Sequence, residues 1–163
     1  MNLLSLHTNF IVKDPSNESL NKKFRIRYPH LPDDYVYFLN TFSLLRNSSD
    51  TTWFNSISDF NGTNDESGFS WNEFEIQSLE ALDGDAENQQ LVKDFWNRHV
   101  PIILSVKNGY AYFAIHVSEE NFGKIYYGRE PEFEETELVS SDFISFIKTI
   151  HNNSLSKEYL DLF

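Results

Sequence analysis

The stretch Pro101–Val117, PIILSVKNGYAYFAIHV, holds two strand-like runs joined by a hairpin turn. The first run, PIILSV, is apolar, and Asn108–Gly109 is a dipeptide that favours a tight hairpin. The second run, YAYFAIHV, alternates with the period of two that a strand requires. A third run, FGKIYYG at Phe122–Gly128, follows a short polar turn. Together the three runs predict an antiparallel meander.

Helical patterns precede and follow this meander. Pro32 and the acidic pair Asp33–Asp34 suit the first turn and positive dipole end of a helix. After them, apolar residues recur at three and four positions, at Tyr35, Phe38, Leu39 and Phe42. A last helix is predicted after an N-cap at Ser141 or Asp142, with an apolar face of Phe143, Phe146, Ile147 and Ile150. Helices, then strands, then a closing helix indicate an α+β fold rather than alternating βαβ units.

The remaining segments give weaker patterns. Residues 16–28 predict a helix capped by Ser16, and residues 46–52 predict a polar loop. Residues 51–60 are β-prone, and residues 69–82 predict a strand with Phe74 and Ile76 on its dry side, because these alternate with polar neighbours. Residues 83–100 predict a helix that turns Leu91 and Phe95 inward, with Val92 as a further candidate, and the tail predicts a short helix.

Composition limits the class of protein. The 163 residues fit one domain, 1–163, and the 16% aromatic content supplies a packed core. The formal net charge of −12 disfavours binding to nucleic acid and to anionic membranes. The charge favours a basic protein partner; the alternative interpretation is that it only keeps the protein soluble. With no cysteine, no signal-peptide pattern at the N-terminus and no apolar run of membrane-spanning length, a soluble cytoplasmic protein is expected.

No pattern of catalytic or ligand-binding residues is visible. The sequence lacks a G-x-S-x-G elbow, an H-E-x-x-H motif and a phosphate-binding glycine loop, and its five histidines are scattered. The stretch DGDAE at Asp83–Glu87 lacks the later positions of a calcium loop and predicts a surface turn with a helix cap. We therefore expect no catalytic residue, no metal and no cofactor.

The acidic stretch EPEFEETELV, Glu130–Val139, holds five glutamates within eight residues. Three readings remain open: a solvated loop anchored by Phe133, a docking surface for a basic partner, or a catalytic carboxylate pair. Crowded like charges favour the first two, because a glycosidase holds its two carboxylates across a cleft. A second candidate is Trp71, which alternates with Glu73 and Glu75.

Three pieces in this order resemble the SUKH superfamily, the SMI/KNR-type proteins. The first is LPDDYVYFLNTFS at Leu31–Ser43, which resembles the family's opening motif. The second is Phe95–Ile115, which is similar to its PI strand, glycine turn and aromatic strand. The third is Gly123–Ile147, which is similar to its strand, acidic connector and closing helix. The resemblance covers about residues 20–150. The glycine pair that usually follows the first motif is missing here, since Phe42 is followed by SLLRNSSD.

The resemblance implies helices packed on one curved, mostly antiparallel sheet and no catalytic residues. Bacterial members act as immunity proteins that bind toxin domains, and fungal members regulate cell-wall synthesis as interaction hubs. The resulting hypothesis is an immunity protein that binds a basic toxin domain such as a nuclease; the alternative is a regulatory or scaffold module without a toxin. The predicted contact residues are Glu130, Glu132, Glu134, Glu135, Tyr126 and Tyr127, followed by Trp71, Glu73 and Glu75.

Overall fold

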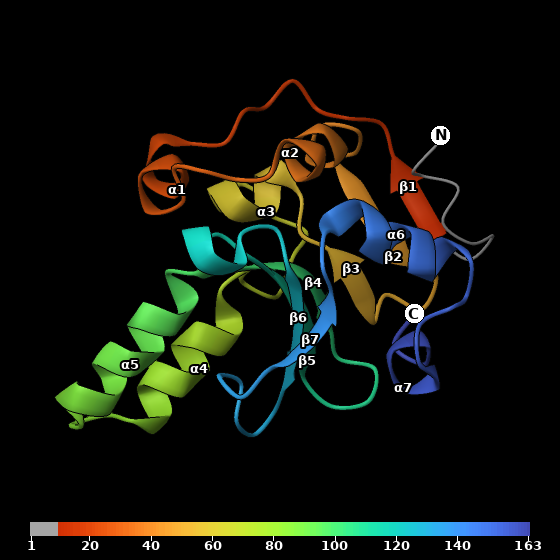
Figure 1. Ribbon diagram of the computed structural model, residues 1–163. Helices are drawn as coiled ribbons and strands as arrows, with labels where there is room; N and C mark the ends of the chain where they lie inside the picture. The colour runs from red at the N-terminus through yellow and green to blue at the C-terminus, as the bar shows by residue number, and fades with distance from the viewer. Residues whose placement is uncertain (1–9) are drawn as a thin grey trace.

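The computed structural model describes residues 10–163, which form one seven-stranded antiparallel sheet with its strands in chain order (Figure 1). The strands are β1 (Phe10–Lys13), β2 (Leu44–Asn47), β3 (Thr52–Phe54), β4 (His99–Ser105), β5 (Ala111–His116), β6 (Ile125–Arg129) and β7 (Glu137–Ser140). The sheet is open, so β1 and β7 are its edges. Residues 1–9 of the N-terminal stretch, with His7, lie outside the described residues.

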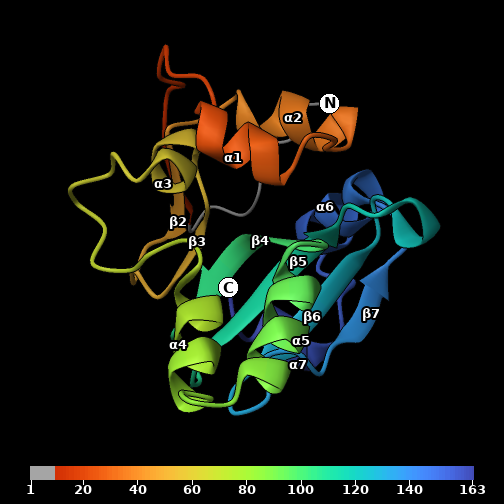
Figure 2. The same ribbon diagram turned by 90° about the vertical axis from the view of Figure 1, so that its left-hand side faces the viewer.

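Seven α-helices are described between and after these strands, together with a short 3-10 helix η1 (Glu119–Asn121). They are α1 (Lys22–Arg27), α2 (Asp33–Leu39), α3 (Ile57–Asn61), α4 (Glu73–Ala81), α5 (Ala86–Trp96), α6 (Phe143–His151) and α7 (Lys157–Leu160). The pair α4–α5 covers one face of the sheet, and α6 and α7 lie on the other (Figures 1 and 2). The predicted α+β class, with helices packed on an antiparallel sheet, is confirmed.

The central hairpin forms where Asn108–Gly109 predicts it. Strands β4 and β5 pair antiparallel from His99↔His116 to Ser105↔Ala111. Gly109 has a φ of 87°, a left-handed conformation that glycine adopts without steric cost. Every residue of both strands is buried. Because helices cover both faces here, neither strand has a solvated side. Alternate side chains of β5 therefore enter two different cores, one on each face of the sheet.

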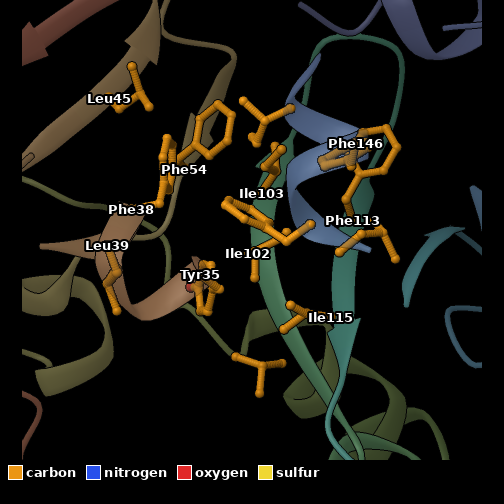
Figure 3. Close-up of a cluster of buried hydrophobic side chains, with 14 of the residues drawn as sticks. Tyr35, Phe38, Leu39, Leu45, Phe54, Ile102, Ile103, Phe113, Ile115 and Phe146 are labelled. Atoms are coloured by element: carbon orange, nitrogen blue, oxygen red, sulfur yellow. The ribbon is translucent and has the colours of Figure 1, made fainter. Parts of the chain in front are cut away.

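The larger core lies on the face beneath α2 and α6 (Figure 3). Phe38 of α2 contacts Phe54 of β3 and Phe143 of α6, with ring centroids 5.6 and 5.1 Å apart. Phe113 of β5 contacts Phe146 of α6 at 5.0 Å. These edge-on and tilted aromatic contacts join α2 and α6 to each other and to the strands beneath them.

The second core lies between α4–α5 and the opposite face of the sheet. Trp96, at the end of α5, packs on Tyr112 of β5 with centroids 4.9 Å apart. Tyr112 also meets Phe74 of α4 at 5.8 Å. A β-carbon on Gly128 of β6 would lie 2.5 Å from the Tyr112 ring, so the missing side chain makes room for it.

Several helices were predicted correctly. Helix α2 buries Tyr35, Phe38 and Leu39 as expected. Helix α6 takes Asp142 as its N-cap, with the carboxylate accepting from the backbone N–H of Ser145. The DGDAE stretch is a surface turn, and Asp85 caps α5 there.

Five local predictions were wrong in whole or in part. Residues 73–81 form helix α4, not a strand, because alternation over so few residues does not distinguish the two and Phe74, Leu79 and Leu82 pack together on the second core. Leu91 is 62% exposed, since Val92 and Trp96 face inward instead. Helix α1 begins after Asn21 rather than Ser16. The loop predicted for residues 46–52 overlaps the end of β2 and the start of β3. The strand predicted for residues 51–60 is present only as β3, which ends at Phe54, and α3 begins at Ile57.

Candidate functional site

The acidic connector, which we define as residues 130–136 between β6 and β7, is anchored to the second core. Phe133 is 5% exposed and stacks on Phe74 of α4, with centroids 4.6 Å apart and planes at 13°. The hydroxyl of Tyr112 donates a hydrogen bond to the carbonyl of Phe133. The buried ring of Phe133 anchors the acidic connector on the second core, and the glutamates on either side of it lie nearer the solvent.

Two of the connector's glutamates are held by neighbouring donors. Oε1 of Glu134 accepts a 2.7 Å hydrogen bond from the indole Nε1 of Trp96. Oε1 of Glu130 accepts a 3.1 Å bond from the backbone N–H of Tyr110, next to the β4–β5 turn. These bonds fix the connector at both ends against α5 and the hairpin.

Glu132 and Glu135 are exposed and present their carboxylates to solvent. Within residues 10–163, no ion pair involves any glutamate of the connector. Glu137, the first residue of β7, instead accepts a 2.9 Å hydrogen bond from the hydroxyl of Tyr159. Burial and that carboxylate raise the pKa of Tyr159 to about 12. The connector therefore carries negative charge that no cation of the described chain neutralises.

The double tyrosine of β6 points to opposite faces of the sheet. Tyr127 is 6% exposed and contacts Phe113 and Tyr159 in the larger core, at 5.3 and 4.8 Å. Tyr126 is half-buried on the α5 side, where its ring lies 5.4 Å from His99. Of the two predicted contact tyrosines, only Tyr126 has appreciable surface to offer.

Tyr126 belongs to an aromatic strip, which we define as Phe95, His99, His116 and Tyr126. The rings of Phe95 and His99 stack at 4.0 Å, and His99 meets His116 edge-on at 4.6 Å. Burial lowers the pKa of His99 to about 4, and burial with the nearby Arg98 charge lowers the pKa of His116. Both rings are therefore neutral at physiological pH. Beside the strip, the β7 partner of Tyr126 is Leu138, which is 56% exposed.

The second predicted group is mostly committed within the chain. Glu75 is 6% exposed, and its two oxygens accept from Arg27 at 2.9 and 2.7 Å. Burial by itself lowers the pKa of Arg27, but the hydrogen bond to Glu75 and the charges around it outweigh this, so the net shift is upward. Trp71 is half-buried and packs edge-on against Phe24 and Phe60, at 5.6 and 5.5 Å. Glu73 is half-buried near Gln77, whose amide donates to it at 3.4 Å.

A ring contact links the segment of Trp71, Glu73 and Glu75 to the acidic connector. Phe74 lies between Glu73 and Glu75 in sequence and stacks on Phe133 of the connector. The carboxylate of Glu75 points instead to α1. Sequence reasoning did not identify the Trp96–Glu134 bond or the exposed Leu138. The run Glu137–Ser140, which forms the edge strand β7, carried the signal for Leu138.

Residues 10–163 contain no group of three or more His, Asp or Glu side chains placed to hold a metal ion. No described helix is both long enough and apolar enough to cross a membrane.

Comparison with known proteins gives one match. The family model described as SMI1 / KNR4 family (SUKH-1) matches residues 20–149, which is 130 of the 163 residues. No curated protein and no solved structure matches the chain. The matched range runs from just before α1 into α6. It therefore includes helices from both faces of the sheet and the whole acidic connector.

Proposed function

The chain belongs to the SMI1/KNR4 family (SUKH-1), and from this premise we propose that it is an immunity protein that neutralises a basic toxin domain by direct binding. Membership of the family supports an immunity or regulatory domain, and protein–protein interaction, in general. The toxin partner, its basic character and a mode of action without catalysis are our proposal.

The observation that carries the proposal is the anchored acidic connector. Glu132 and Glu135 are exposed and unpaired by any described cation, on a segment that Phe133 fastens to the second core. A segment that is already ordered loses little conformational entropy when a partner binds. Leu138 and the half-buried Tyr126 offer apolar surface alongside. An apolar centre with a charged rim is a common arrangement for a protein interface.

The charge of the whole chain acts in the same direction. A formal charge of −12 attracts a basic partner over a distance and raises its rate of encounter at low salt. A toxin domain that acts on nucleic acid needs a basic surface because it binds phosphates. An acidic protein that occupies such a surface blocks it without any reaction, so binding alone accounts for immunity.

The test is rescue of cells. The toxin-like reading frame nearest the gene is expressed in a sensitive strain with and without this protein, and the affinity of the purified pair is measured at several salt concentrations. The test variant is Glu132→Lys with Glu135→Lys, since neither side chain accepts a described structural hydrogen bond. The matched control is Glu119→Lys with Glu120→Lys, an exposed pair in η1 at the opposite end of β6.

We expect rescue by the wild type and by the control, and a one-to-one complex that weakens as salt rises. The connector variant should lose affinity by at least ten-fold and lose most of that salt dependence. Equal affinities for the two variants would contradict the assignment of the connector. Failure of the wild type to rescue or to bind would contradict the immunity role and leave a regulatory module as the reading.

A further inference from the structure

A cleft of about 470 Å³ opens on the side of the sheet that α4 and α5 cover, and one of its lining residues, Tyr110, also contacts the acidic connector. It lies between strands β2–β3 and the loop at residues 62–70, which is visible as the projecting yellow loop in Figure 2. The residues that matter for the inference are Arg46, Asp50, Trp53, Glu66, Phe69 and Tyr110.

Three aromatic rings make a continuous wall of the cleft. Phe69 of the loop meets Trp53 of β3 with centroids 5.8 Å apart and planes at 74°. On its other side Phe69 meets Tyr110 at 5.6 Å and 68°. All three side chains are half-buried, so each keeps part of its surface toward the opening. Such a wall suits a flat or elongated group rather than water alone.

The charges around this wall are unequal. Three carboxylates, Asp50, Asp59 and Glu66, line the cleft against one guanidinium, Arg46. Both oxygens of Asp59 have partners, because Oδ2 accepts from the backbone N–H and the hydroxyl of Ser56 at the cap of α3, and Oδ1 accepts from the amide of Asn64. Asp50 and Glu66 have side chains that are 65% and 80% exposed, at the rim.

The two rim carboxylates have only weak internal partners. Asp50 lies 3.2 Å from Arg46, and Glu66 lies 3.6 Å from Lys13. Exposed pairs of this kind contribute little to stability, because solvent screens them and the side chains lose entropy. A cation from outside can therefore displace or join these pairs at small cost.

We propose that the cleft receives an arginine side chain of the protein partner. The apolar stem and the planar guanidinium would lie along Trp53 and Phe69, and the charged end would meet Asp50 and Glu66 at the rim. Guanidinium groups stack on aromatic faces and pair with carboxylates, and a long basic side chain buries its stem against apolar surface. The inference rests on the proposed function for the identity of the partner, and it adds a second contact site to the connector.

The first experiment needs no toxin. The probe is N-acetyl-arginine methylamide, followed by ¹H–¹⁵N NMR, with the indole signal of Trp53 assigned from a Trp53→Phe variant. N-acetyl-citrulline methylamide, which has nearly the same shape without the charge, is the control ligand. We expect saturable shifts of Trp53 and of the backbone signals of Phe69 and Tyr110 at millimolar arginine probe, and none with citrulline.

The second arm uses the variant Asp50→Asn with Glu66→Gln. It should weaken binding of the probe several-fold, whereas the matched variant Glu119→Gln with Glu120→Gln should not. The affinity of these two double variants for the toxin domain is then measured. Absence of saturable shifts, equal shifts with citrulline, or an unchanged affinity in the Asp50/Glu66 variant would overturn the inference.

The outcomes also separate this inference from the proposed function. If wild-type protein rescues cells but the arginine probe does not bind, only the cleft inference fails. If the probe binds but no toxin is neutralised, the immunity role fails, and the arginine is not that of a toxin. If the probe binds and the Asp50/Glu66 variant also loses toxin affinity, both stand.

Discussion

The indole Nε1 of Trp96 donates a 2.7 Å hydrogen bond to Oε1 of Glu134, and this bond ties the end of α5 to the acidic connector. Trp96 is 1% exposed, so its N–H has little access to water. The connector is thus fixed by a buried aromatic donor as well as by the stacked ring of Phe133. Glu134, like Glu130, therefore has a structural role, which leaves the exposed charge of the connector to Glu132 and Glu135.

Replacement of Glu134 by alanine should therefore destabilise the fold. The change removes the acceptor and leaves the buried indole N–H of Trp96 without it, at a cost of about 1–2 kcal/mol in the free energy of unfolding. Glu134→Gln keeps an acceptor oxygen and should cost less than half as much. Urea unfolding of both variants measures the difference. If the alanine and glutamine variants were equally stable, the bond would contribute nothing.

The Arg27–Glu75 pair gives a second prediction. The side chain of Glu75 is 8% exposed and that of Arg27 is 25% exposed. Arg27→Met would leave a buried carboxylate unpaired, and loss of one partner of a buried pair costs on the order of 3 kcal/mol. The double variant Arg27→Met with Glu75→Leu should recover most of that loss.

Thermal and urea unfolding would test this, with Arg25→Met as the control. Arg25 is an exposed basic residue on the same helix, so its replacement should change stability by less than about 0.5 kcal/mol. A loss from Arg27→Met no larger than that of Arg25→Met would show that Glu75 finds other solvation.

The buried histidine of the aromatic strip should make stability depend on pH. The pKa of His99 in the folded protein is about 4, below its ordinary value of 6.5, so on acidification the unfolded chain takes up the proton first. The stability from a neutral His99 is therefore complete above about pH 6.5 and is lost as the pH falls toward 4. The full difference is at most about 3 kcal/mol.

The measurement is the free energy of unfolding between pH 4 and 8 for wild type and for His99→Phe. Carboxylates contribute in both proteins, so the difference between the two curves isolates His99 and its neighbour His116. The free energy of unfolding of the wild type, relative to that of His99→Phe, should fall by about 1–3 kcal/mol as the pH falls through this window. Parallel curves for His99→Phe would contradict the prediction.

Gly128 gives a steric prediction. Its β-carbon would lie 2.5 Å from ring atoms of Tyr112, well inside contact distance, and Tyr112 is fully buried against Trp96. Gly128→Ala should therefore cost about 1–3 kcal/mol in stability, because the ring has little space to retreat. Gly68→Ala is the control, since no atom lies within 4 Å of its added carbon. Equal stabilities of the two variants would mean that β6 shifts freely.

The local sequence determined the elements whose apolar spacing and end signals agree. Helices α2 and α6 and the β4–β5 hairpin were predictable because each combines a cap or turn residue with regular apolar spacing over enough residues. Helix α4 was not predictable, because five alternating residues fit a strand as well as a helix, and only packing of Phe74 on Phe133 and Tyr112 distinguishes them. Phe133 itself was correctly predicted as an anchor.

The surface was determined differently. Sequence showed that the acidic stretch exists and that the chain has an excess of carboxylates. Which glutamates have a partner within the chain depends on the tertiary structure: Glu75 pairs with Arg27, Glu134 with Trp96, and Glu130 with the backbone of Tyr110. Their partners lie 20 to 48 residues away along the chain. Contacts over such separations arise from how helices and strands pack, which no local pattern of residues records.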